Sequence, residues 1–426
     1  MPSRNFDDIK VFDDSENAID IMRTIIDVEG QDDAFYILDV ADILEKHKMW
    51  ISKMPRVIPH YAIKCNPDPN VIKVLAALNS NFDCASEMEM RQVMQFGVSG
   101  DRIIFANPTK PVNHIKFAKQ VNVSRMTADS EFELLKIKDI YPDAKIFLRI
   151  RCDAKITPVS LGPKFGCDPD GEAFRLIDFT KNIGLNLHGF SFHVGSPCGE
   201  LNAYNRGIGM CKRLMAYARS IGCKDCQVID IGGGFNGESG SVIDKLANIV
   251  NDAINDLDPS VKIISEPGQY FVASAFTLAA NLHSKRIVPK GDKMLRMYYV
   301  SCGVYGAFIE ELLNLKARQP TVLYEPSSDE KFLSTVWGPT CDSYDCIVKD
   351  VMLPECHIGD WFYWSDMGAY SISLACSFNG FIPPVVIPFM KKRQWKDFNM
   401  CIAGLQKRTE TEWSDEMDSL ECIGAR

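Results

Sequence analysis

The stretch VIPHYAIKCNPDPNVIKVLAAL (residues 57–78) joins a short β-rich run to a segment whose apolar residues recur at helical spacing. Seven further runs of the β-rich kind follow, separated by segments with helical spacing: FDCAS (82–86), RIIFAN (102–107), SRMTAD (124–129), KIFLRI (145–150), LHGFSFHVGS (187–196), CQVIDIGGG (226–234) and KIISEPG (262–268). Eight strand–helix units within about 210 residues predict a closed, parallel β/α barrel. An open, doubly wound sheet is the alternative architecture.

The sequence changes character after Glu266. Strand-like runs broken by Gly and Pro replace the alternating pattern, as in MLRMYYVSCGVYGAF (294–308) and FIPPVVIPF (381–389). This change predicts a second, β-rich domain. We place the barrel at residues 35–275 and the β-rich domain at residues 1–34 and 276–426. From Lys391 onward we expect a helix and then a loosely ordered, charged tail.

Composition narrows the class of protein. A net charge of −9 opposes binding to nucleic acid or to an anionic membrane, and the N-terminal residues contain no apolar signal segment. The uncharged stretch 367–390 has the length of a membrane span, but its prolines and Asn379 make it a poor lipid-facing helix. Fifteen cysteines, odd in number and scattered through a long chain, are typical of reduced thiols in a cytoplasmic protein.

Two short motifs indicate functions that their context does not support. Cys223 and Cys226 have C-x-x-C spacing, but no partner pair or histidine follows at the usual zinc spacing, so we expect no metal. Gly232, Gly234 and Gly237 match the dinucleotide fingerprint G-x-G-x-x-G. In a nucleotide-binding sheet this motif opens the first unit, whereas here it follows six other strands.

Polar residues gather where the predicted strands end, and a β/α barrel brings these ends together in one mouth. The first run ends at Lys64, the sixth contains His193, and the eighth ends at Glu266. A lysine amine can join the aldehyde of pyridoxal phosphate, and a carboxylate keeps the pyridine nitrogen of that cofactor protonated. Each residue alone is also explained by an ordinary role, as a solvated lysine, a core histidine or a paired carboxylate.

The glycines after the seventh run complete this set. Gly232, Gly233 and Gly234 would let backbone N–H groups approach a phosphate, and we expect the following helix to add its positive end. A lysine, a histidine, a carboxylate and a glycine cradle in one mouth predict a pyridoxal phosphate site.

The segments around these residues resemble the eukaryotic ornithine decarboxylases, a branch of the alanine-racemase-like (group IV) pyridoxal-phosphate decarboxylases. The matching segments occur in family order: PHYAIKCNPDP (59–69), FDCAS (82–86), SFHVGS (191–196), DIGGGF (230–235), EPGQYFVASAF (266–276), GVYGAF (303–308), WGPTCDSYD (337–345) and HIGDWFYWSDMGAYSISLACSFNGF (357–381). The resemblance implies a barrel with a β-domain, and a homodimer with shared active sites. It also implies conversion of ornithine to putrescine in polyamine biosynthesis.

The resemblance also implies roles for single residues. Lys64 would bind the cofactor aldehyde, Glu266 the pyridine nitrogen and His193 the ring face. Asp83 and Arg149 would belong to the network around Lys64. Phosphate contacts would come from Ser196, Gly234 and Tyr370, with Gly232, Gly233 and Gln269 beside them.

The partner subunit would complete the site by the same resemblance. Cys341 would return a proton to the substrate carbon after carbon dioxide leaves, although a loop cysteine is ordinarily a small packed hydrophobe. Asp342 would hold the distal amine of the substrate. Phe378 would shape the pocket wall, and Tyr305 and Asn314 belong to the same substrate-binding group.

Two departures from the family pattern bear on function. Gln269 stands where the family has an arginine for the cofactor phosphate, and the loss of such a contact costs roughly 1.5–3 kcal/mol. Leu313 and Asn314 replace a Tyr-Asp pair that binds the distal ammonium. Glu310 or Glu311 are candidates to compensate.

These departures leave three functions open. The first is an ornithine decarboxylase, and the second is a decarboxylase of another amino acid, such as lysine, arginine or a less basic one. The third is a non-catalytic regulator that resembles the antizyme inhibitors. Residues 114–145 match the family's antizyme-binding region, with sparse basic residues, so antizyme is a candidate partner.

Overall fold

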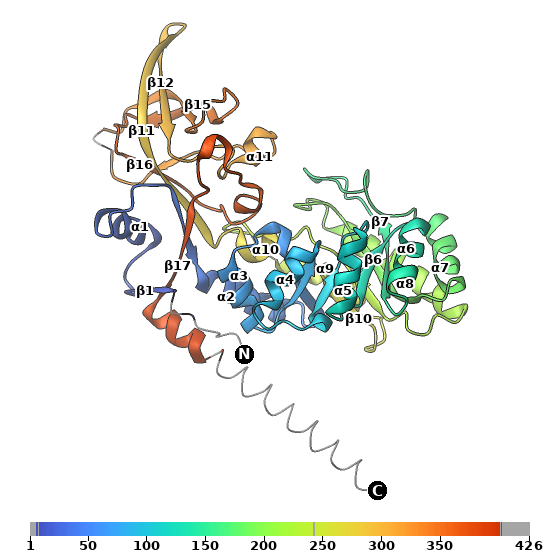
Figure 1. Cartoon of the computed structure of the whole chain (residues 1–426). Helices are drawn as coiled ribbons and strands as arrows, with labels where there is room; N and C mark the ends of the chain where they lie inside the picture. Colours follow the sequence, from blue (N-terminus) through green and yellow to red (C-terminus); the bar gives the residue numbers. More distant parts are fainter. Residues whose placement is uncertain (1–5, 7, 242, 327, 401, 403–426) are drawn as a thin grey trace.

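The computed structural model describes residues 6, 8–241, 243–326, 328–400 and 402, which form a barrel and a large sheet (Figure 1). Eight strands close the barrel in the order β10-β3-β4-β5-β6-β7-β8-β9, and all neighbours run parallel. The strands are β3 (Val57–Ala62), β4 (Asn81–Cys84), β5 (Ile103–Phe105), β6 (Arg125–Ala128), β7 (Lys145–Arg151), β8 (Asn186–His193), β9 (Val228–Asp230) and β10 (Lys262–Ser265). The predicted barrel is therefore confirmed, and the open-sheet alternative is wrong.

Helices connect the barrel strands on the outside, as the helical spacing between the runs predicted. They are α3 (Pro69–Ala77), α4 (Glu87–Met94), α5 (Val112–Gln120), α6 (Glu131–Ile140), α7 (Glu172–Asn182), α8 (Asn202–Ser220) and α9 (Asp244–Ile254), with α2 (Val40–Lys53) before β3 and α10 (Gln269–Val272) after β10. Capping side chains start several of them: Ser86 accepts from the N–H of Glu89, and Ser130 from that of Glu133.

A small apolar cluster fills the barrel interior. Ile104, Phe147, Val228 and Ile264 come from four different strands and are buried together with Ala106. Each strand alternates its side chains between inside and outside, so residues two positions further along point into the barrel one layer higher. Most of these next inward-facing positions carry polar side chains. The apolar layer therefore lies directly below the polar residues of the barrel mouth.

The second half is a nine-stranded sheet among the described residues (Figure 1). Its main path is β1 (Lys10–Phe12), β17 (Val385–Lys391), β2 (Phe35–Asp39), β11 (Phe276–Lys290), β12 (Lys293–Val300), β14 (Lys331–Trp337) and β15 (Cys346–Pro354). Off this path, β16 (Trp361–Trp364) pairs with β11, and β13 (Thr321–Val322) pairs with β16. Two helices, α1 (Ala18–Asp27) and α11 (Ile309–Leu312), accompany it. The N-terminal segment completes the β-rich half, as predicted.

The predicted division at residues 35 and 275 remains a prediction, and β2 bears on it. This strand lies inside the predicted barrel range, yet it pairs with β11 and β17 of the sheet. The closed barrel begins only at β3. At the other end, residues 392–400 are helical, and the predicted charged tail lies outside the described residues. Among the described helices, none is long and apolar enough to cross a membrane.

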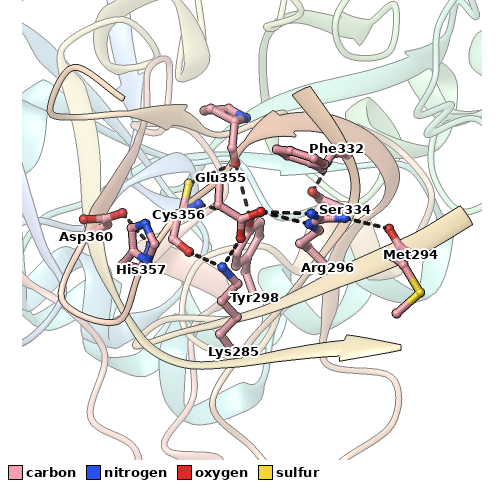
Figure 2. A network of polar contacts seen from close by, with 11 residues as sticks. Lys285, Met294, Arg296, Tyr298, Phe332, Ser334, Glu355, Cys356, His357 and Asp360 are labelled. Carbon is pink, nitrogen blue, oxygen red and sulfur yellow. Dashed lines mark hydrogen bonds and ion pairs between the residues drawn. The ribbon is translucent and has the colours of Figure 1, made fainter. Parts of the chain in front are cut away.

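A polar network holds the outer part of the sheet together (Figure 2). Glu355, directly after β15, accepts hydrogen bonds from Lys285 of β11 and from Arg296 Nε of β12, the latter at 3.1 Å. The Lys285 ammonium also donates to the carbonyl of Cys356 at 2.7 Å. Lys285 and Glu355 are both mostly buried, and their pairing ties three strands into one unit.

Candidate active site

Lys64 lies in a short 3₁₀ turn, Ile63–Cys65, that follows β3 directly. Its Nζ donates to Oδ2 of Asp83 on β4 at 2.9 Å. Burial opposes the charge on Lys64, but Asp83, Glu266 and Tyr370 outweigh it and raise the pKa of the amine. The side chain is 46% exposed in the mouth, while Asp83 is buried. The amine is therefore held in place by a carboxylate and remains open to a ligand.

A buried carboxyl pair lies at the ends of β9 and β10. Burial and the neighbouring charges of Asp230 and Asp83 raise the pKa of Glu266 well above its usual value. Burial likewise raises the pKa of Asp230 to about 7. Asp230 Oδ2 is buried and receives no hydrogen bond from an N–H or O–H donor among the described residues. A proton shared between the Asp230 and Glu266 carboxyl groups would provide this hydrogen bond. The pair therefore retains a proton near neutral pH.

Asp230 was missed by the sequence reasoning, although a signal was present. It is the one charged residue at the end of the apolar run Val228–Asp230, directly before the glycines. The glycines that follow are a stronger local signal for a binding loop, and they mask the carboxylate beside them.

The three glycines are required by close packing between neighbouring strand ends. Gly232 and Gly234 have φ angles of +66° and +97°, which residues with a Cβ rarely adopt. A Cβ on Gly234 would lie 2.4 Å from the carbonyl oxygen of Gly195, and one on Gly233 would lie 2.8 Å from that of Glu266. The glycines therefore let the ends of β8, β9 and β10 approach one another closely, and no side chain of their own projects from this segment.

A loop separates the glycines from the helix that follows them. Helix α9 begins at Asp244. Side chains stabilise turns in the loop: Asn236 accepts from the N–H of Glu238, and Asp366 from the N–H of Ser239. The expected contribution of the positive end of α9 stays a prediction.

His193 and Arg149 lie at the ends of β8 and β7. The Gly195 N–H donates to His193 Nδ1 at 3.0 Å, and Nε2 faces Gly233, where a Cβ would lie 3.0 Å away. Burial, with the positive charges of Arg149 and Lys64, lowers the pKa of His193 well below its usual value. The imidazole is therefore neutral at neutral pH and presents a flat, uncharged face.

Three further predicted cofactor contacts are neutral polar side chains, those of Ser196, Gln269 and Tyr370. Ser196 Oγ donates to Oε1 of the buried Gln269 at 3.5 Å. Tyr370 has a φ of +53°, and its N–H donates to the Cys65 carbonyl at 3.0 Å, which brings its ring beside Lys64. Burial raises the pKa of Tyr370, so its hydroxyl stays protonated.

A second group of predicted residues lies in loops of the β-rich half. Tyr305 Oη donates to Asp342 Oδ2, and this bond lowers the pKa of Asp342. The rings of Tyr305 and Phe378 lie 4.5 Å apart, centroid to centroid, and Cys341 is exposed beside Asp342. Among the described residues, no hydrogen bond or ion pair joins this group to Lys64 or to the carboxyl pair.

Asp345 anchors this second group and was not singled out from the sequence. It is buried, and it accepts from the N–H groups of Val304 at 2.8 Å and Thr340 at 2.9 Å. These bonds join the loop that carries Tyr305 to the loop that carries Cys341. Only the three-dimensional structure reveals this connection, because the two loops lie far apart in sequence.

The mouth segment 309–318 contains the predicted substrate position Asn314. Asn314 is exposed, has a φ of +55°, and donates its N–H to the Glu311 carbonyl at 3.0 Å. Arg318 pairs with Glu310 at 2.7 Å and with Glu311 at 2.6 Å. Both candidate compensating carboxylates are therefore already neutralised within this chain.

The first group of residues fits pyridoxal phosphate. Lys64 offers a reachable amine, and a proton-holding carboxyl pair lies where the ring nitrogen would need one. The glycine segment carries no side chain, and Ser196 and Tyr370 each offer a hydroxyl, Ser196 beside Gln269 and Tyr370 in the segment bonded to Cys65. One requirement is unmet, since the described side chains predicted to contact the phosphate carry no positive charge.

Comparison with known proteins gives a consistent result. Residues 40–273 match the family model for the pyridoxal-binding domain of pyridoxal-dependent decarboxylases. The chain is 38% identical to antizyme inhibitor 2 of Xenopus laevis, over 95% of this chain and 92% of that protein. It is 39% identical to ornithine decarboxylase 2 of Drosophila melanogaster, over 88% and 96%. The solved arginine decarboxylase of Paramecium bursaria Chlorella virus superposes with a TM-score of 0.83 at 37% identity, covering 87% of this chain and all of that one.

Proposed function

The chain belongs to the pyridoxal-dependent decarboxylase family, in the branch of the eukaryotic ornithine decarboxylases, and on this premise we propose that it releases carbon dioxide from an amino acid, with ornithine as the first candidate substrate. Pyridoxal phosphate is the cofactor of this family. The observation that carries the proposal is the Lys64–Asp83 contact beside the buried carboxyl pair of Asp230 and Glu266.

Each residue of the barrel mouth would have a different chemical role in this reaction. Held by Lys64, the cofactor would supply an electron sink for the bond that breaks when carbon dioxide leaves. Asp83 orients the Lys64 amine, and Glu266 with Asp230 keeps a proton at the place of the ring nitrogen. Neutral His193 offers a flat face without adding charge that would oppose the protonated ring.

The loops of the β-rich half would complete the site in a homodimer. Cys341 of the partner subunit would donate a proton to the substrate carbon, because a thiol can do so near neutral pH. Asp342 of the partner subunit would pair with the distal amine. Its bond from Tyr305 keeps this carboxylate ionised and oriented. This arrangement is supported by the exposure of Cys341, which leaves its thiol accessible to a second subunit.

The direct test is an amino-acid panel with detection of released carbon dioxide. It covers ornithine, lysine, arginine, leucine and the aromatic amino acids, each with the purified, cofactor-saturated protein. We expect ornithine to be the best substrate. A larger rate with another member would correct the substrate and keep the decarboxylase, whereas no carbon dioxide from any of them would reject the activity.

A second candidate function is a regulator without turnover, like the antizyme inhibitors. Two observations favour it: the similarity to the Xenopus protein and the neutral Gln269 at the predicted phosphate contact. The predicted antizyme-binding region, residues 114–145, forms most of α5, then β6, and then α6. Tight capture of antizyme by cofactor-free protein, together with an inactive panel, would establish this function. Turnover without capture would exclude it.

A further inference from the structure

The predicted phosphate site lacks a positive charge among its contacts. The side chains of Ser196, Gln269 and Tyr370 are all neutral, and Gln269 is buried. A phosphate monoester carries about −1.5 to −2 charges at pH 7, and burying such a charge without a cation is costly. If the cofactor binds as proposed, another residue of this chain must supply the cation.

A cavity of about 410 Å³ opens beside Ser196 and contains the candidates. Barrel loops contribute Ser196 and Glu238 to its lining, and the mouth segment 309–318 contributes Lys316 and Arg318. Lys46 is close by but is not among the lining residues. Its ammonium donates to the Gly237 carbonyl at 2.8 Å instead. The choice is therefore between Lys316 and Arg318.

Arg318 is already committed to other partners. Its guanidinium forms two short contacts, one with Glu310 and one with the buried Glu311. Turning it away would leave Glu311 ionised and unpaired in a buried position, which is strongly unfavourable. Arg318 therefore holds the mouth segment in place and is not free to bind a ligand.

Lys316 is held less firmly and can reorient. Its ammonium contacts Glu238 at 2.8 Å and Glu310 at 3.5 Å, and the Glu238 side chain is 38% exposed. A lysine has a flexible stem and three donors, so it can keep one partner while it contacts another. Burial raises the pKa of Cys65 to about 12, while the charges of Lys64 and Lys316 act to lower it.

We propose that Lys316 supplies the cation for the cofactor phosphate in this chain, where Gln269 cannot. The proposal rests on the proposed cofactor site. Glu238, the present partner of Lys316, would then compete with the phosphate for the same ammonium. The mouth segment would then be joined to the cofactor through one side chain.

The test compares two forms of the cofactor on the variant Lys316→Met. Dissociation constants for pyridoxal phosphate and for pyridoxal, which lacks the phosphate, are measured by absorbance titration. Loss of a charge-assisted contact should weaken pyridoxal phosphate binding about tenfold to a hundredfold. Pyridoxal binding should not change. As a matched control, Lys290→Met removes a distant lysine at the end of β11, which pairs with Asp350 of β15. This variant should leave both dissociation constants unchanged.

Two further experiments extend the test, and the first of them, Glu238→Gln, keeps it decisive if Lys316→Met folds poorly. Glu238→Gln should tighten pyridoxal phosphate binding several-fold, because it removes the competing carboxylate. In a Gln269→Arg background, Lys316→Met should lose much less affinity than in the natural chain. Two results would overturn the role of Lys316 without affecting the proposed cofactor site. One is an equal loss of affinity for pyridoxal phosphate and pyridoxal in Lys316→Met, and the other is an unchanged dissociation constant of pyridoxal phosphate in Glu238→Gln. A natural chain that binds neither ligand would overturn the cofactor site as well.

Discussion

Asp230 and Glu266 show how two carboxyl groups acquire a proton affinity that neither would have alone. Each is an ordinary acid in sequence, but the barrel brings them together out of water, and both then hold protons at higher pH. A proton held at this place is what a pyridine nitrogen needs in order to remain cationic. Desolvation is the decisive effect here, since it is the largest cause of both pKa shifts.

The carboxyl pair predicts a specific pH dependence of stability. The pKa of Asp230 rises from 3.8 to about 7 on folding, so the folded state binds the extra proton between these values. Its stabilising contribution is complete below the lower value and is lost as the pH rises through the upper one. Relative to Asp230→Asn, the natural cofactor-free protein should lose up to about 1.4 kcal/mol of unfolding free energy per pH unit in this range. Urea unfolding of both proteins at several pH values checks this. The same pH dependence of the unfolding free energy in the natural protein and in Asp230→Asn would contradict it.

Asn314 predicts a change in substrate preference. Asn314→Asp restores a carboxylate at the mouth, and a charged contact to a distal ammonium should raise the turnover ratio of ornithine to leucine about tenfold. The control Asn79→Asp changes an exposed asparagine with a similar φ of +60° at the opposite end of the barrel. An unchanged ratio for Asn314→Asp would reject this position as a determinant of specificity.

At the residue level, the sequence predicted those site residues that end a barrel strand. Lys64, His193 and Glu266 meet in the mouth because parallel strands of one barrel end on the same side. Asp345 and Lys316 could not be predicted in this way. Their importance depends on contacts between loops far apart in sequence, and no local pattern specifies such contacts.

At the level of elements, the alternation of runs predicted each of the eight barrel strands. It succeeded because each unit is local, with a β-rich run followed by an amphipathic helix. After the glycines, side chains of Asn236 and Asp366 stabilise a loop that precedes α9. No predicted run covered strand β2, because its pairing with β11 and β17 depends on residues more than two hundred positions away.

The network of Figure 2 predicts how strongly three sheet strands depend on one carboxylate. Glu355→Gln leaves Lys285 and Arg296 without their ionic partner in a mostly buried place, and should cost about 1–3 kcal/mol of unfolding free energy. Burial opposes the charge of Glu355, but its two partners lower the pKa below 4.5. The stabilisation is therefore present above this value and is lost as the pH falls.

Urea unfolding of the natural chain and Glu355→Gln measures this difference at neutral and acidic pH. Asp350→Asn is the matched control, because it breaks an exposed ion pair between β15 and Lys290 of β11. This change should cost about 1 kcal/mol of unfolding free energy or less. A cost for Glu355→Gln no larger than that of the control would contradict the account.

At the level of the whole molecule, the proposed function assigns the two groups of candidate site residues to two copies of the chain. Lys64 and the carboxyl pair lie in the barrel mouth, whereas Cys341 and Asp342 lie in loops of the β-rich half. The proposed head-to-tail homodimer would bring the two groups together across the interface, in two equivalent sites.

Shared sites predict complementation between two inactive variants. Lys64→Ala and Cys341→Ala should each release almost no product alone. Equal amounts, unfolded and refolded together, should recover about a quarter of the natural activity, because half of the dimers are mixed and each has one intact site. A mixture as inactive as its components would place both residues in one subunit's site. Mixing with Cys223→Ala, a thiol at the opposite end of the barrel, provides the reference for a fully active partner.

The central claim is that the Lys64 amine binds the aldehyde of pyridoxal phosphate. Reduction of the cofactor-saturated protein with borohydride would make this bond permanent, and peptide mass spectrometry would then locate it. The account predicts a single labelled peptide, with the pyridoxyl group on Lys64, and no label in Lys64→Ala. Label on another lysine, or an unlabelled Lys64 at saturating cofactor, would contradict it.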